Sequence, residues 1–224
     1  MQSILRSDFI RKVFILFSGT SIAQLIPILI SPILTRIYTA QEFGTFGLYV
    51  AIVALFSVIS TGRFEIAILL PKKNIDAVQL TNLSLLLAVL FSVFISFPLL
   101  IWGDHLSFWF NNSNFKNVVY LIPIAIALNG FVQSLNYWTN RMNNFKLIAL
   151  GKVGRSTGSS IAQIMTGLAQ IGTIGLVFGQ MFGVVIEVFI LVKNYKLIKN
   201  FKIFSKKKLF NLLQSIKIFQ NMMY

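Results

Sequence analysis

The chain alternates long uncharged, mostly apolar runs with short charged segments. The uncharged runs cover residues 13–35, 43–62, 77–103, 117–140 and 156–186. A run of about 18 or more apolar residues is long enough to cross a bilayer as a helix. The pattern therefore predicts an all-α integral membrane protein, built as a bundle of transmembrane helices.

The last of these runs decides how many helices the bundle holds. As one helix, residues 156–186 would be about 46 Å long, against about 30 Å for the hydrocarbon core of a bilayer. If the run is divided between two helices, 18 of the 20 lysines and arginines lie on the side of the N-terminus, whereas a single helix would put ten on each side. Because positive charge is retained in the cytoplasm, the division predicts six spans with both termini cytoplasmic.

This topology divides the chain into three parts. Residues 1–12 form a basic cytoplasmic leader, residues 13–192 a six-helix transmembrane lobe, and residues 193–224 a basic cytoplasmic tail or a truncated linker to a second lobe. Apolar residues at helical spacing between Leu209 and Phe219 also fit a helix on the membrane surface. The six spans are expected at about 13–35, 43–62, 78–102, 118–140, 152–168 and 173–192.

Composition agrees with a membrane location and excludes other classes of function. Only 12% of the 224 residues are charged, whereas soluble domains have about 25%. The net charge of +14 could suggest nucleic acid, but the cations flank hydrophobic runs as orientation signals do, so no nucleic-acid partner is expected. Without cysteine and with one histidine, the chain offers no thiol chemistry and no His/Cys metal site, and neither a metal nor a cofactor is expected.

Polar side chains recur at helical spacing in three of the expected spans. Residues three or four apart share one face of a helix, so the stripes predict a water-accessible cavity lined by spans one, two, four and five. The alternative is that amides and hydroxyls only join helices by hydrogen bonds, worth about 0.6 kcal/mol each. Span three is almost wholly apolar, as expected for a lipid-facing helix. The stripes are Thr20, Gln24, Ser31 and Thr35 in span one, Asn129, Gln133, Asn136 and Asn140 in span four, and Arg155, Ser159, Gln163 and Thr166 in span five.

Span six has two features of its own. Gly175, Gly179 and Gly183 recur at every fourth residue, a spacing that lets another backbone approach closely. It favours packing inside the bundle over a dimer interface. Glu187 lies in the last turns of the span, where it can pair with Lys193 at the membrane surface or with a cation of the bundle such as Arg155; the first pairing is favoured.

The segment 61–71 carries Arg63 and Glu65 between two apolar runs. Charged groups at the edge of hydrocarbon are costly and usually face a cavity, a partner or the membrane surface. Residues two apart on a helix point to nearly opposite sides, so the two cannot pair with each other if the helix continues, and each would then need another partner. A guanidinium in a cavity suits a phosphate or pyrophosphate, which it can hold through two parallel hydrogen bonds. Alternatively, both side chains lie at the headgroup level with Lys72 and Lys73.

Three stretches of the chain resemble a known family. They read SPILTRIYTAQEFGTFGLY (Ser31–Tyr49), RFEIAILLP (Arg63–Pro71) and QIMTGLAQIGTIGLVFGQMFG (Gln163–Gly183). They look like the polysaccharide (O-antigen type) flippases of the multidrug/oligosaccharidyl-lipid/polysaccharide exporter superfamily. The arginine–aromatic–glutamate pattern followed by an aliphatic run and proline is the most specific part, and the resemblance spans most of residues 10–195.

The resemblance implies a transporter, not an enzyme. It would move undecaprenyl-pyrophosphate-linked oligosaccharide units of the lipopolysaccharide O-antigen or capsule type across the bacterial inner membrane, between two six-helix lobes. The chain supplies one lobe only and is expected to be a half-length fragment. Its expected partners are membrane lipids, the lipid-linked oligosaccharide and other polysaccharide-assembly proteins. The candidate cavity residues that would bind the substrate are Arg63, Glu65, Gln24, Gln133, Asn136, Arg155 and Gln163.

Three other functions stay open. An exporter of cationic drugs in the same superfamily would need acidic cavity residues, for which Glu65 and Glu187 are available. A membrane enzyme would need a general base or nucleophile at the interface, and Asp104 with His105 is the available pair, more typical of a loop cap. A non-transporting membrane subunit is the third.

Overall fold

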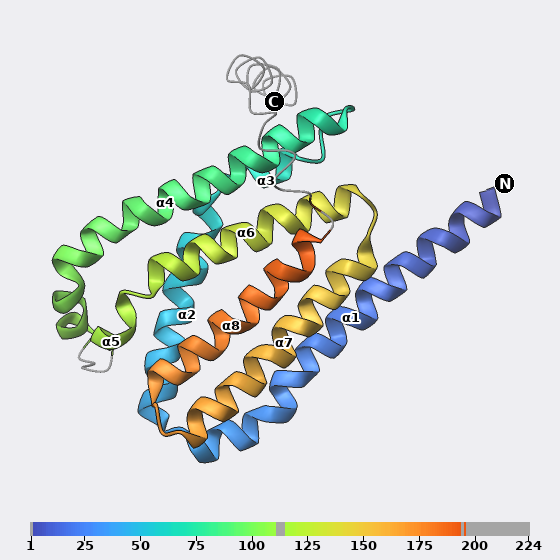
Figure 1. Ribbon diagram of the computed structural model, residues 1–224. Coiled ribbons are helices and arrows are strands. Elements are labelled where there is room, and N and C mark those ends of the chain that lie inside the picture. The colour runs from blue at the N-terminus through green and yellow to red at the C-terminus, as the bar shows by residue number, and fades with distance from the viewer. Residues whose placement is uncertain (1, 111–114, 194, 196–224) are drawn as a thin grey trace.

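A computed structural model describes residues 2–110, 115–193 and 195 of the chain (Figure 1). The described residues form eight helices, of which six are long and two are single turns. The tail segment 209–219, for which the sequence suggests a surface helix, lies outside the described residues. The helices are α1 (Gln2–Ile37), α2 (Ala40–Ser60), α3 (Phe64–Ala67), α4 (Asn74–Trp109), α5 (Lys116–Val119), α6 (Ile122–Arg141), α7 (Phe145–Leu168) and α8 (Thr173–Val192).

Four of the described helices are long and apolar enough to cross a membrane. They correspond to residues 10–37 of α1, to α2, to residues 74–103 of α4 and to α8. The helices α6 and α7 carry two of the polar stripes, which lowers their hydropathy. The chain is thus an all-α, multi-pass membrane protein, and a count of six spans stays a prediction.

The bundle is organised around α6, α7 and α8. The helix α1 lies along α7, α7 lies against α8, and α8 contacts α6, while α4 covers the other side of α6 (Figure 1). The helix α2 crosses behind and contacts both α6 and α8. The start of α1, the α2–α4 connector, the α6–α7 turn and the end of α8 therefore lie at one end of the bundle.

The uncharged run 156–186 is divided between two antiparallel helices. The helix α7 ends at Leu168, and Gln170 and Gly172 take positive φ values of 56° and 71° before α8 begins. A Cβ on Gly179 would lie only 2.5 Å from Cγ of Gln163, and one on Gly183 would overlap the carbonyl oxygen of Arg155. The predicted role of these glycines, internal helix packing, is confirmed.

The first helix is longer than its hydrophobic run. It continues through Pro27 and Pro32 to Ile37, and its last turns depart from the direction of the long N-terminal part (Figure 1). Proline removes a backbone hydrogen bond and bends a helix at that point. A capping box between Thr39 and Glu42 then starts α2, because each side chain accepts a hydrogen bond from the other residue's backbone N–H.

The prediction that span three faces lipid is correct for only half of α4. The residues from Leu86 onward include many exposed apolar side chains, such as Phe94 and Phe97. Residues 77–85, by contrast, are buried, and Asn82 accepts a 2.6 Å hydrogen bond from the hydroxyl of Tyr195. The helix also continues through Asp104 to Trp109, into a stretch that the composition suggests is a loop.

Candidate functional site

The main cavity of the bundle has a volume of about 600 Å³ and lies where five helices meet. It contains side chains from α1, α2, α6 and α7, which are the four spans predicted to line a cavity, and from α8 as well. Its polar lining residues are Thr20, Gln24, Asn136, Lys152, Arg155, Ser156, Ser159, Ser160, Gln163, Gln180 and Glu187. Its apolar lining residues are Ala23, Pro27, Leu34, Phe46, Val50 and Val132.

An ion pair joins α7 to α8 in the cavity wall. Nη1 of Arg155 lies 3.2 Å from Oε2 of Glu187. The carboxylate is buried, with 3% of its side chain exposed, whereas the arginine side chain is 31% exposed. The prediction that favoured Lys193 as the partner of Glu187 is therefore wrong. A buried carboxylate needs such a partner because desolvation without one costs several kcal/mol.

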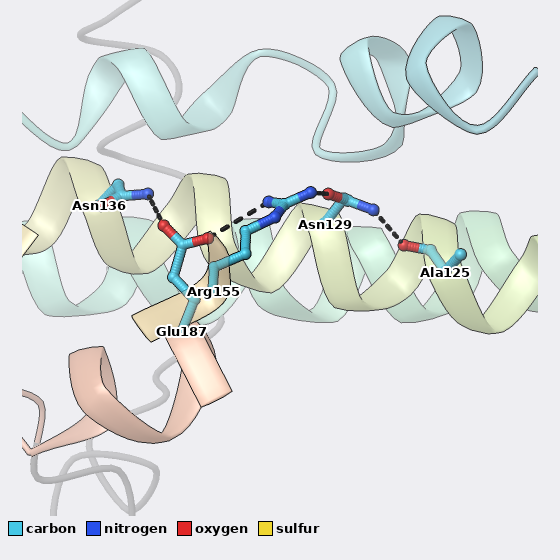
Figure 2. Close-up of polar contacts among 5 residues, drawn as sticks. All are labelled: Ala125, Asn129, Asn136, Arg155 and Glu187. Carbon is cyan, nitrogen blue, oxygen red and sulfur yellow. Dashed lines mark hydrogen bonds and ion pairs between the residues drawn. The ribbon is translucent and has the colours of Figure 1, made fainter. Parts of the chain in front are cut away.

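The ion pair belongs to a longer chain of polar contacts that reaches α6. Nδ2 of Asn136 donates to Oε1 of Glu187 at 3.3 Å, and Nη2 of Arg155 donates to Oδ1 of Asn129 at 3.4 Å (Figure 2). The amide of Asn129 is in turn held by the carbonyl oxygen of Ala125 at 2.8 Å (Figure 2). Arg155 therefore keeps a fixed position while several of its five N–H donors stay available to a ligand.

A second cation lies one turn earlier on α7. Nζ of Lys152 donates to Oγ1 of Thr20 at 3.2 Å, across to α1. An ammonium has three donors, so this contact leaves Lys152 able to bind an anion as well. Among the described residues that line the cavity, the two cations outnumber the single carboxylate, Glu187. The cavity is therefore suited to an anionic group.

Two amide oxygens in the cavity wall have no hydrogen-bond partner among the described residues. They are Oδ1 of Asn136 and Oε1 of Gln180, both buried. Most buried polar atoms are hydrogen-bonded, and an exception calls for a ligand or a water. Gln163, in contrast, is engaged, since its Nε2 donates to the carbonyl oxygen of Leu176 at 3.2 Å.

Close packing of α1 on α7 fixes the remaining wall. A Cβ on Gly19 would overlap the side chain of Ala149, and the hydroxyl of Ser156 donates to the carbonyl oxygen of Ala23 at 2.6 Å. Tyr38, directly after α1, donates to the carbonyl oxygen of Gln163 at 2.7 Å. These contacts hold α1 near both ends of the cavity.

The comparison with family models decides the family. A model described as polysaccharide biosynthesis protein matches residues 33–223. The chain belongs to this family. Comparisons with curated proteins and with solved structures gave no match.

The family match covers most of the cavity of this polysaccharide biosynthesis protein. All lining residues of α2, α6, α7 and α8 lie within the matched residues, including Arg155 and Glu187. The match begins at residue 33, so it does not include most lining residues of α1, among them Thr20 and Gln24. Membership supports a role in polysaccharide biosynthesis or transport.

Four of the seven predicted site residues of this family member line the cavity, and three do not. Gln24, Asn136, Arg155 and Gln163 come together there. Gln133 is turned toward α2, where its Nε2 donates to the carbonyl oxygen of Ser57 at 3.3 Å. In this structure the amide of Gln133 joins two helices and does not line the cavity.

Arg63 and Glu65 also lie outside the cavity lining. The helix α2 ends at Ser60, and Gly62 and Arg63 both have positive φ, 59° and 63°. The chain therefore turns here, and the helical geometry assumed for this pair does not hold. Arg63 is exposed, while Glu65 is buried and accepts a hydrogen bond from the hydroxyl of Thr61.

Arg141, the last residue of α6, has a structural role that its place in the sequence does not indicate. Its guanidinium donates to the carbonyl oxygens of Ile68, at 3.1 Å, Leu69, at 3.3 Å, and Pro71. It also donates to Oδ1 of Asn74 at 3.3 Å. Arg141 thus clamps the α3–α4 connector to α6, which explains how a non-helical backbone is satisfied here. Its position at the end of a span looks in the sequence like any orientation signal.

Proposed function

We propose that the chain acts as a membrane transporter that flips undecaprenyl-pyrophosphate-linked oligosaccharide units, of the O-antigen or capsule type, across the bacterial inner membrane. The observation that carries the proposal is the cavity of about 600 Å³ with Lys152 and Arg155 one turn apart in its wall. The proposed reaction is translocation only, with no covalent step.

The two cations are the proposed binding site for the pyrophosphate. A guanidinium can hold a phosphate through two parallel hydrogen bonds, and an ammonium adds a compact point charge beside it. Charge-assisted hydrogen bonds are worth about 1.5–3 kcal/mol each. In the empty cavity Glu187 neutralises Arg155, so a bound anion shares the guanidinium with the carboxylate.

The other lining residues suit the sugar and the lipid. The amide side chains of Asn136 and Gln180 line the cavity, and amides can hydrogen-bond sugar hydroxyls. The apolar wall, including Pro27, Leu34 and Phe46, offers a surface for the first isoprenoid units. This mixture of convergent polar groups and apolar walls is typical of ligand pockets.

The proposed orientation places the charged part of the cavity on the cytoplasmic side. The end of the bundle where α7 begins also holds the first part of α1 and the α3–α4 connector, and these segments carry Arg11, Lys12, Lys72, Lys73 and Lys146. The opposite end holds the end of α1 and α5, which carry Arg36 and Lys116. Positive charge marks the cytoplasmic side. Lys152 and Arg155 lie about 10 and 15 Å along α7 from its start, where a substrate made in the cytoplasm would reach them.

The binding step is tested with undecaprenyl pyrophosphate and the detergent-purified chain. We expect binding that the Arg155→Gln variant weakens by about tenfold or more, since a charge-assisted hydrogen bond is lost. The Lys72→Gln variant is the control, because Lys72 is exposed and does not line the cavity. Equal affinity of Arg155→Gln and the unsubstituted protein would refute the pyrophosphate site.

The transport step is tested in liposomes with a fluorescent undecaprenyl-pyrophosphate-linked N-acetylglucosamine. We expect the purified chain to expose the probe to a quencher added outside, and Arg155→Gln to abolish this. Binding without movement of the probe would contradict transport by this chain and leave the binding site standing.

The cavity chemistry speaks against the drug-exporter alternative. Glu187 is the one carboxylate among its described lining residues, and it is paired with Arg155. Glu65 does not line the cavity and is bound by Thr61. A cationic drug would therefore meet two cations and no unpaired carboxylate.

A further inference from the structure

A second pocket lies at the end of the bundle where α1 approaches the start of α7. Its volume is about 230 Å³. Three of its seven lining residues are cations, Arg11, Lys12 and Lys146, and none is acidic. In the described part of the chain, these three cations form no ion pair. The remaining lining residues are Ile15, Asn143, Asn144 and Phe145.

The walls of this basic pocket are held in place by short-range contacts. The α6–α7 turn is only three residues long, and Asn143 takes a left-handed φ of 55°. The N–H of Asn144 bonds back to the carbonyl oxygen of Thr139 at 3.2 Å, closing the end of α6. One turn deeper along α1, Gly19 packs against Ala149. The cations therefore project from a fixed backbone frame.

An apolar stripe on α1 begins at the level of the pocket. Ile10, Phe14 and Phe17 are 59%, 68% and 69% exposed. Their spacing of four and three residues puts them on one helix face, next to the face that carries Arg11 and Ile15. The stripe runs from the charged end toward the hydrophobic middle of the bundle. The basic pocket therefore adjoins an exposed apolar face of α1.

We propose that this pocket binds the phosphate headgroup of an anionic phospholipid, with the acyl chains lying along Ile10, Phe14 and Phe17. Cations near a membrane surface attract anionic lipids, and basic pockets between helices bind their headgroups. The two pockets do not share a lining residue, so the lipid site is separate from the cavity and does not depend on the proposed transport.

The headgroup contact is tested by native mass spectrometry of the detergent-purified chain with dioleoyl phosphatidylglycerol or dioleoyl phosphatidylcholine. We expect the phosphatidylglycerol adduct to exceed the phosphatidylcholine adduct by about 100-fold, at roughly fivefold for each of the three cations. The variant Arg11→Gln/Lys12→Gln/Lys146→Gln should lose this excess. The control Lys72→Gln/Lys73→Gln/Lys193→Gln removes the same charge from exposed positions at the same end of the bundle and should keep it.

Two results would overturn the headgroup assignment. One is an equal loss of the phosphatidylglycerol excess in both triple variants, because the lipid would then be attracted by the overall positive charge of this end and not by the pocket. The other is equal binding of the two lipids to the unsubstituted chain. If the triple variant does not fold, as judged by its helical circular dichroism, Arg11→Gln and Lys146→Gln are measured singly, each with an expected loss of roughly fivefold.

The acyl-chain contact separates a lipid from a soluble anion. Phe14→Ser/Phe17→Ser should weaken the phosphatidylglycerol adduct, whereas Phe94→Ser/Phe97→Ser, which alters equally exposed residues of α4, should not. Inorganic phosphate and glycerol 3-phosphate should form no stable adduct at the lipid concentration. Adducts as strong as those of the lipid would identify a soluble phosphate as the ligand and overturn the lipid assignment.

Discussion

Arg155 and Glu187 pair across α7 and α8, but the two side chains differ in their access to water. The carboxylate is 3% exposed, and the guanidinium, with Nη1 3.2 Å from the carboxylate, is 31% exposed toward the cavity. The pair is therefore asymmetric. Removal of the arginine leaves a buried carboxylate without its counter-charge, whereas removal of the glutamate leaves a guanidinium that is partly exposed to water.

Arg155→Gln should destabilise the protein more than Glu187→Gln. The first substitution leaves the buried carboxylate unpaired, which costs about 3–5 kcal/mol when an ion pair is buried. The second leaves a guanidinium that the cavity can hydrate, at about 1–3 kcal/mol. The measurement is thermal unfolding in detergent, and the double variant should recover part of the loss. The reverse order of stability would contradict the assigned burial.

Gly183→Ala should separate α7 from α8. The new Cβ would overlap the carbonyl oxygen of Arg155, which belongs to the backbone and has little freedom to move. Overpacking of this kind costs about 1–3 kcal/mol. The matched control is Gly47→Ala on α2, where a Cβ meets nothing within 4 Å. There the better helix propensity of alanine should stabilise by up to about 1 kcal/mol. Similar unfolding temperatures for both variants would contradict the close approach.

Arg141→Lys should loosen the connector between α3 and α4 although the charge is kept. An ammonium cannot reproduce the planar fork that reaches Ile68, Leu69 and Pro71 together. We expect faster hydrogen exchange of the backbone amides from residue 68 to residue 74, measured by mass spectrometry. Lys146→Arg serves as a control, because Lys146 lines the basic pocket with Arg11 and Lys12 at the start of α7. Unchanged exchange in Arg141→Lys would show that the clamp is not needed.

Arg63→Gly should leave binding of undecaprenyl pyrophosphate unchanged. Arg63 is exposed and lies outside the cavity lining, in contrast to Arg155. Because its φ is 63°, glycine should also relieve about 1 kcal/mol of backbone strain and raise the unfolding temperature. Binding is compared with Arg155→Gln in the same titration. A loss of affinity equal to that of Arg155→Gln would restore Arg63 to the binding site.

The proposed orientation can be checked with single cysteines, because the chain has none of its own. Lys116→Cys should react with a membrane-impermeant maleimide in bacterial cells whose outer membrane alone has been opened. Lys12→Cys should react only after the inner membrane is opened as well. Labelling of both under the first condition, or of Lys12→Cys alone, would refute the orientation.

Helical periodicity predicted much of the cavity before its geometry was known. The stripes in spans one and five placed Gln24, Arg155 and Gln163 on faces that do meet there. The same reasoning fails for Gln133, since a stripe gives the face of a helix but not which neighbour it meets. Where two helices flank one face, an amide can join them instead of lining a space.

The partner of Glu187 shows a second limit of sequence reasoning. Lys193 follows it by six residues, and a separation of three or four is needed for two side chains to meet on a helix. Arg155 is remote in sequence. It becomes a neighbour of Glu187 because the glycines of α8 let that helix pack closely on α7, which carries Arg155. The segment around Arg63 fails for a different reason. Glycine is a common signal for the end of a helix, and α2 ends just before Gly62. Arg63 and Glu65 therefore do not lie on one continuous helix.

The glycine contacts also restrict how the cavity can change shape. Because α7 and α8 touch backbone to side chain at Gly175, Gly179 and Gly183, neither helix can slide past the other without a collision. The two helices must therefore move together as a rigid body, and Lys152, Arg155 and Glu187 keep their mutual distances in any such motion. Because Tyr38 also ties the end of α1 to α7, a change in the shape of the cavity would fall to α2, the helix across it, and an anion held by this cluster would move with α7 and α8.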